Sequence, residues 1–142
     1  MRVTDRSLAY GVLRVSFGVN FLMHGAIRIH NGIGAFAATT AEHLAKAPLP
    51  HGFVLGFGYV IPVIEVALGV ALVLGVLTRV ALLAGAVFMI ALTVGVTANQ
   101  QWDVAGQQLV YSGVFFVLLY LIDHNLLAID GLRGRGRPSS IQ

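Results

Sequence analysis

The sequence predicts an all-α integral membrane protein, an antiparallel four-helix bundle with a short interfacial helix between its first two spans. Of its 142 residues, 57% are hydrophobic and 11% are charged, whereas soluble domains average about 25% charged residues. Apolar stretches long enough to cross a bilayer recur along the chain. Polar residues interrupt them, above all Glu65. A carboxylate at mid-bilayer depth is costly, so it is usually paired or functional.

The first predicted span covers about residues 7–29 and is the least apolar of the four. It carries Arg14, Asn20, His24 and Arg28. We therefore expect this span to turn a polar stripe toward the other helices rather than toward lipid.

A connecting segment follows the glycine-rich turn at residues 31–34. Thr39 and Glu42 have the spacing of a capping box, which marks a helix start. Pro48 and Pro50 end the pattern. These signals predict a short helix at the membrane surface.

Three further spans are predicted at about residues 53–77, 80–98 and 104–122. Pro62 lies inside the second span and removes a backbone donor three residues before Glu65. The link between the second and third spans is short, at Thr78 and Arg79, so these helices should be antiparallel neighbours.

Basic residues predict how the chain is oriented in its membrane. Lys46 lies on one side and most arginines lie on the other, so both termini are expected in the cytoplasm. The arginines on that side are Arg2, Arg6, Arg79, Arg133, Arg135 and Arg137. Residues 1–130 form one predicted membrane domain, and residues 131–142 form a basic cytoplasmic tail. The net charge of +3 reflects this topology, and no nucleic-acid partner is expected.

Depth along the helices predicts an ion pair between Arg14 and Glu65. At ~1.5 Å per residue, Arg14 lies about 10 Å and Glu65 about 18 Å from the cytoplasmic ends of their spans. A long arginine side chain covers much of that difference. The pair either fixes helix register or belongs to a functional site.

Further polar groups cluster in the outer half of the predicted bundle. We expect Asn20, His24, Glu65, Gln108 and Tyr111 to line a ligand-binding cavity, because several costly groups lie at one depth. Alternatives remain open: His24 bonds a neighbouring carbonyl, and Thr93 and Thr97 bond their own helix. No metal site is predicted, since cysteine is absent and the histidines do not pair at one depth. Catalytic residues are not identified.

Several motifs together resemble the DoxX family of small four-span bacterial membrane proteins. They are His24-Gly25 with a cation at position 28, Pro48-Leu-Pro50, Glu65 with Gly69, Leu74-Gly-Val-Leu-Thr-Arg79 and Ala128-Ile-Asp130. The resemblance covers nearly the whole chain and implies the four-span fold. The family is named for a small subunit of a thiosulfate:quinone oxidoreductase, so it implies a quinone ligand and a redox partner subunit. The chain departs from the family pattern at Arg28, where lysine is usual, and at Asp123-His124-Asn125.

Two functions follow from these features. The first is a quinone-linked redox accessory subunit or small oxidoreductase, with His24, Gln108 and Tyr111 as donors and Glu65 as a proton relay. The second is a non-enzymatic membrane scaffold, chaperone or small-molecule permeation protein. Besides the bilayer, a redox subunit and a second copy of the chain are the candidate partners. Whether the protein is an enzyme is left open at this stage.

Overall fold

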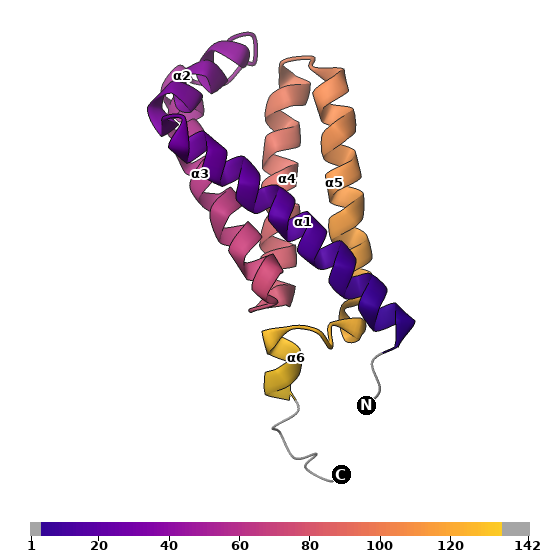
Figure 1. Ribbon diagram of the computed structural model, residues 1–142. Coiled ribbons are helices and arrows are strands. Elements are labelled where there is room, and N and C mark those ends of the chain that lie inside the picture. The colour runs from indigo at the N-terminus through magenta and orange to yellow at the C-terminus, as the bar shows by residue number, and fades with distance from the viewer. Residues whose placement is uncertain (1–3, 135–142) are drawn as a thin grey trace, which may run out of the picture.

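The computed structural model describes residues 4–134, and that part of the chain is helical with no strand (Figure 1). This confirms the all-α class. The helices are α1 (Asp5–His30), α2 (Ile33–His43), α3 (His51–Leu74), α4 (Thr78–Ala98), α5 (Trp102–Tyr120), the short 3-10 helix η1 (Ile122–His124) and α6 (Ile129–Gly134).

The four long helices form two pairs. α1 packs along α3 and α4 packs along α5, whereas α3 and α4 contact each other less. Figure 1 shows α4 and α5 side by side, with α1 and α3 running obliquely to them. The arrangement is therefore more open than a regular antiparallel bundle. The start of α1 and helix α6 lie at one end of the molecule, and the α4–α5 connection lies at the other.

Glycines bring α1 and α3 into close contact and define their register. A Cβ atom on Gly18, Gly25 or Gly69 would collide with the facing helix, so only glycine allows this approach. The facing positions are Val73 for Gly18, Val66 for Gly25 and Leu22 for Gly69. This register carries α1 well past the end of α3, because position 74 then lies opposite position 17.

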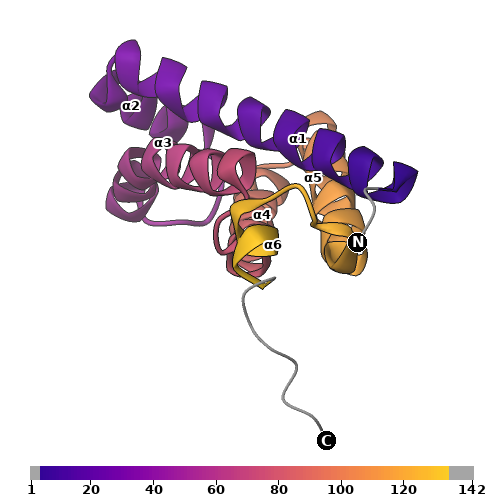
Figure 2. The same cartoon turned by 60° about the horizontal axis from the view of Figure 1, so that its bottom comes forward.

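Aromatic side chains connect the two pairs. The ring of Phe17 lies 4.8 Å from that of Phe115, edge to face, and Phe21 lies 5.9 Å from Tyr111. Phe115 also packs directly on Gly85 of α4. Edge-to-face pairs of this kind contribute about 0.5–1.5 kcal/mol each beyond their buried area. The cluster joins α1 to α5. Figure 2 shows the course of α1 over the other helices with the bottom of Figure 1 turned forward.

A short helix does follow the first long helix, but it begins earlier than predicted. Gly32 has a φ of 104°, which permits a tight reversal directly after α1, so α2 starts at Ile33. Thr39 and Glu42 therefore lie inside α2 and the predicted capping box is wrong. α2 packs on α3, where Ala37 meets Gly58.

The turn between α3 and α4 also differs from the prediction. Gly75 adopts a left-handed conformation with a φ of 67° and ends α3 at Leu74. The link is therefore residues 75–77, and Thr78 already belongs to α4. α3 itself continues through Pro62.

Helix α6 was not predicted, and it closes the end of the molecule at which α1 begins. The Asp130 carboxylate accepts hydrogen bonds from the backbone amides of Leu77 at 3.0 Å and Thr78 at 2.7 Å. It also accepts one from the Thr78 hydroxyl at 2.8 Å. Asp130 thus caps the start of α4 from another element. The predicted basic tail from residue 131 overlaps α6 up to Gly134, and residues 135–142 lie outside the described part.

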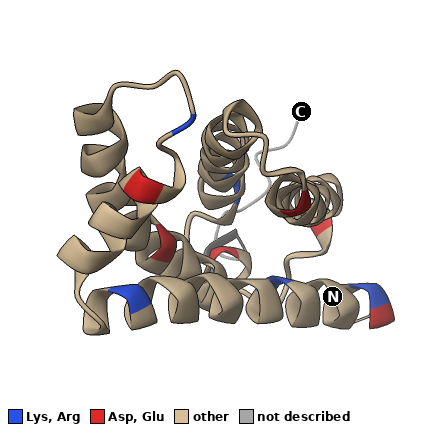
Figure 3. Ribbon diagram, turned by 90° about the horizontal axis from the view of Figure 1, so that it is seen from above, with Lys and Arg blue, Asp and Glu red and all other residues tan. Residues whose placement is uncertain are grey.

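The described helices expose many large apolar side chains and bury a few polar ones among an apolar core. Two of them, α3 and α4, are long and apolar enough to cross a membrane. Large apolar side chains are exposed on α1 and α5, for example Val12 and Phe116, each 67% exposed. Arg14, in contrast, is buried. Figure 3 shows how few charged residues the helices carry. The buried Arg14 and the exposed apolar side chains differ from the pattern of a soluble domain, in which charged residues are almost never fully buried.

Candidate functional site

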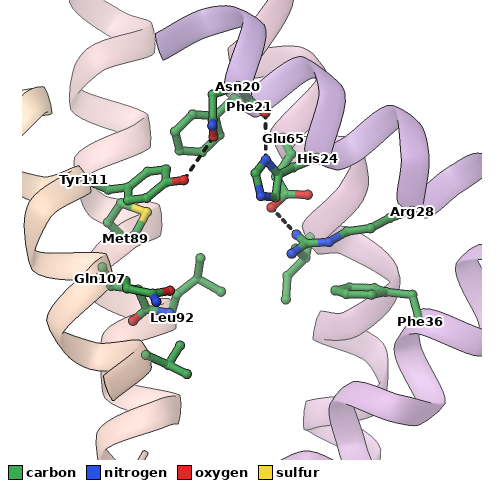
Figure 4. Close-up of a pocket in the computed structure, with 13 residues that line it drawn as sticks. Asn20, Phe21, His24, Arg28, Phe36, Glu65, Met89, Leu92, Gln107 and Tyr111 are labelled. Atoms are coloured by element: carbon green, nitrogen blue, oxygen red, sulfur yellow. Dashed lines mark hydrogen bonds and ion pairs between the residues drawn. The ribbon is translucent and has the colours of Figure 1, made fainter. Parts of the chain in front are cut away.

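A cavity of about 220 Å³ opens between the two helix pairs in the half of the molecule away from α6 (Figures 1 and 4). All five predicted ligand-binding residues line it: Asn20, His24, Glu65, Gln108 and Tyr111. The remaining lining residues are Phe21, Arg28, Phe36, Ile61, Met89, Leu92, Val104 and Gln107. Figure 4 shows α1 and α3 on one side of the cavity and α4 and α5 on the other.

Glu65 is paired with Arg28 at this cavity. The Arg28 guanidinium donates to Glu65 Oε1, and it also stacks over the Phe36 ring at 4.5 Å from its centroid. The side chain of Glu65 is only 7% exposed, whereas that of Arg28 is 30% exposed. The pair therefore closes one side of the cavity, with the carboxylate inside and the cation toward its mouth.

The predicted direct pair between Arg14 and Glu65 is wrong. Extending the α1–α3 register places position 65 opposite position 26 and position 14 opposite position 77. At ~1.5 Å per residue, the levels of Arg14 and Glu65 along the helix pair are therefore about 18 Å apart. The depth estimate failed because it treated the ends of the two helices as level, whereas α1 extends past α3.

Arg14 serves a different structural role. Its guanidinium donates to the carbonyl oxygens of Leu72, of Val73 at 3.1 Å and of Leu127 at 2.6 Å. These carbonyls come from the end of α3 and from the segment before α6. A buried arginine thus joins three parts of the chain through backbone acceptors, which satisfies groups that a helix end otherwise leaves unpaired.

Asn20 bonds two further residues that line the cavity. His24 Nδ1 lies 2.8 Å from the Asn20 carbonyl oxygen. Because a carbonyl only accepts, Nδ1 carries the hydrogen, and Nε2 of the neutral ring is left as an acceptor. The Tyr111 hydroxyl donates to Asn20 Oδ1 at 3.0 Å, which links α5 to α1. The donors predicted for a ligand, His24 and Tyr111, are therefore partly used within the protein.

The two threonines predicted near the cavity bond their own helix. Thr93 donates to the Met89 carbonyl at 2.8 Å and Thr97 to the Thr93 carbonyl at 2.6 Å. Neither lines the cavity. The alternative interpretation of these residues is confirmed.

Two buried acceptors at the cavity have no partner within the described residues. They are Glu65 Oε2 and Gln108 Oε1. A buried polar atom without a hydrogen bond costs about 1–3 kcal/mol, so such atoms are rare in native structures. Both belong to side chains that line the same cavity. A hydrogen-bond donor that reached either atom would remove this cost.

Sequence reasoning missed Arg28 as the partner of Glu65. The signal was present, because positions 20, 24 and 28 are spaced by four residues and form one stripe of α1. It also missed the apolar lining, including Met89 and Leu92, which has no polar signature. Within residues 4–134, no group of three or more potential metal ligands occurs.

Within residues 4–134, the fold and site define a small helical protein with two helices long and apolar enough to cross a membrane and a cavity with polar groups between helix pairs. The profile of the DoxX family matches residues 9–98. The chain belongs to the DoxX family. No curated protein matches the chain, and no solved structure matches it.

Proposed function

We propose that the protein is a multi-pass subunit of the bacterial plasma membrane that binds the hydroquinone form of a quinone and holds it for a redox partner subunit. The observation that carries this proposal is the pair of unpartnered buried acceptors, Glu65 Oε2 and Gln108 Oε1, at one cavity. A hydroquinone has two hydroxyl donors on an apolar ring, whereas a quinone has only acceptors.

The membrane setting is supported by the distribution of side chains. α1 exposes large apolar side chains such as Val12, while Arg14 is buried and Arg28 is partly buried. α5 exposes Leu109, Val110 and Phe116. In lipid, an exposed apolar face and an internal polar cavity are the stable arrangement. All four long helices are therefore proposed to cross the bilayer, with both termini in the cytoplasm.

The apolar part of the cavity suits an aromatic ring. Phe21, Met89 and Leu92 line it between the polar groups. Methionine sulfur makes favourable contacts with aromatic rings. Arg28, held over Phe36, places a positive charge beside the Glu65 carboxylate and occupies Oε1, which leaves Oε2 without a partner among the described residues.

Binding of matched reduced and oxidised ligands tests this proposal. The purified protein in nanodiscs is titrated with 1,4-hydroquinone, 1,4-benzoquinone and the dimethyl ether of hydroquinone, and heat is recorded. We expect hydroquinone to bind about 10-fold to 100-fold more tightly than the other two, since hydrogen bonds to charged groups contribute about 1.5–3 kcal/mol. Gln108→Met removes one acceptor at similar volume and should reduce the preference for hydroquinone.

Glu42→Gln is the matched control, because Glu42 is an exposed carboxylate on α2. It should leave the preference unchanged, whereas Glu65→Gln should reduce it. Equal affinity for all three ligands would contradict the proposal and favour the non-enzymatic alternative, a scaffold, chaperone or permeation protein.

A further inference from the structure

A second, larger cavity of about 450 Å³ lies beside the first, between α2, α3 and α4. Its lining is mainly apolar and includes Leu44, Leu49, Phe53 and Phe57. On α3 it uses residues 53–61, so it lies nearer the outer end of that helix than Glu65 does. We call it the apolar chamber.

The polar groups at the rim of the apolar chamber are already bonded to one another. The His43 carbonyl accepts from Asn99 Nδ2 at 2.6 Å and from Gln101 Nε2 at 3.2 Å. The Thr40 hydroxyl donates to the Phe36 carbonyl at 2.8 Å. Among the described residues, none that lines the apolar chamber carries a buried side-chain atom without a partner, whereas two that line the polar cavity do.

The polar cavity and the apolar chamber share two lining residues, Ile61 of α3 and Leu92 of α4. Side chains that line both volumes lie between them, and these two are aliphatic. The two volumes are therefore neighbouring compartments with a thin apolar wall.

We infer that the two compartments form one binding volume for an amphiphile, with its hydroxylated ring in the polar cavity and an apolar chain in the apolar chamber. This inference rests on the proposed function for the ring, and it adds the class of ligand: a molecule with a long hydrocarbon substituent. The hydrocarbon chain of the bound ligand extends toward α2 and the α4–α5 loop rather than outward between α1 and α5.

An occupied apolar chamber is more stable than an empty one. Atoms that line a void lose dispersion contacts with the missing neighbours, and an apolar cavity stays dry because water finds no partners there. With a water occupying about 30 Å³ of liquid, about 450 Å³ corresponds to roughly fifteen groups of that size. A hydrocarbon chain restores these contacts without leaving a polar group unpaired.

Photolabelling tests where the hydrocarbon chain of the ligand lies. The probe is a 1,4-hydroquinone with a decyl chain that ends in a diazirine, bound to the full-length protein in nanodiscs. After irradiation, peptide mass spectrometry should find the label on Leu44, Leu49 or Phe53. Unlabelled 1,4-hydroquinone in excess should remove most of this label, because the ring and the chain of one molecule bind together.

Two variants of α4 provide a matched pair. Ala91 lines the apolar chamber, and Ala84 lies two turns earlier on the same face of α4 without lining any cavity described above. Ala91→Phe should lower labelling at Leu44 and Leu49 several-fold, whereas Ala84→Phe should leave it unchanged.

The outcomes separate this inference from the proposed function. Label on the exposed residues Leu109 or Phe116 of α5, still removed by free hydroquinone, would overturn the chain's placement and leave the ring site intact. Label in the apolar chamber that free hydroquinone does not remove would show an independent lipid site and overturn the single volume. If free hydroquinone shows no binding in the titration above, the proposed function fails as well.

Discussion

Glu65 uses one carboxylate oxygen for an ion pair and keeps the other free. Oε1 accepts from Arg28, while Oε2 is buried without a partner among the described residues. The ion pair offsets the cost of a charge at this depth, and the free oxygen gives the cavity its acceptor. Glu65 thus has a structural role in the ion pair and, in the proposed function, a second role as an acceptor for the ligand.

At the residue scale, a double-mutant cycle tests which arginine is the partner of Glu65. Glu65→Gln and Arg28→Gln should each lower the free energy of unfolding in detergent, and the double mutant should recover part of the loss. For residues in contact, the effects of two substitutions on the free energy of unfolding differ from their sum by about 0.5–3 kcal/mol. For distant residues the two effects add within about 0.5 kcal/mol. The Arg14→Gln and Glu65→Gln pair should therefore be additive. Coupling in that second cycle and none in the first would contradict the assignment.

The sequence indicated the cavity residues but not their partners. Placing polar side chains in an apolar setting costs free energy, and such residues can be recognised from composition alone. The five recognised in this way all line one cavity: Asn20, His24, Glu65, Gln108 and Tyr111. Which arginine reaches Glu65 depends on helix register, and close contacts at glycines set that register. A depth count from assumed helix ends cannot supply it.

At the element scale, the α1–α3 contact depends on glycine. A Cβ on Gly25 would lie 2.8 Å from the backbone nitrogen of Val66, and overpacking of this kind costs about 1–3 kcal/mol. Gly25→Ala should therefore lower the midpoint of thermal unfolding in detergent.

Gly56→Ala is the matched control on α3, because a Cβ there meets nothing within 4 Å. Alanine is favoured over glycine in a helix by up to about 1 kcal/mol, so this variant should be neutral or slightly stabilising. Equal effects of the two substitutions would show that the close contact is absent.

The capping of α4 by Asp130 gives a second prediction at this scale. Asp130→Ala removes acceptors for the amides of Leu77 and Thr78 and a negative charge from a helix start. Loss of a cap costs about 0.5–2 kcal/mol, measurable as a lower unfolding midpoint. Asp123→Ala, at an exposed carboxylate in η1, should have little effect. If both variants unfold alike, the cap does not contribute.

The long helices were predictable, whereas of the two short α-helices only the existence of α2 was predicted, with the wrong start, and α6 was missed. α3, α4 and α5 begin and end within a few residues of the predicted spans because apolar runs define them. α2 and α6 depend on local backbone and long-range contacts, such as the positive φ of Gly32 and the bonds from Asp130 to the α3–α4 turn. Neither has a signature in hydropathy.

At the scale of the whole molecule, the proposed topology places the α4–α5 loop outside and η1 in the cytoplasm. The chain has no cysteine, so single cysteines report position directly. In intact cells, a membrane-impermeant maleimide should label Asp103→Cys and should label Asp123→Cys only after permeabilisation. Both positions are exposed. The reverse pattern would invert the topology.

The central claim is that the cavity between the helix pairs binds a hydrogen-bond donor through Glu65 and Gln108. An experimental density map of the protein in lipid nanodiscs with bound hydroquinone tests it most directly. The account predicts density for the ring between α1 and α5, with one hydroxyl oxygen within hydrogen-bonding distance of Glu65 Oε2 and the other near Gln108 Oε1. A map in which these two side chains bond to other protein groups, with no ligand density between them, would contradict it.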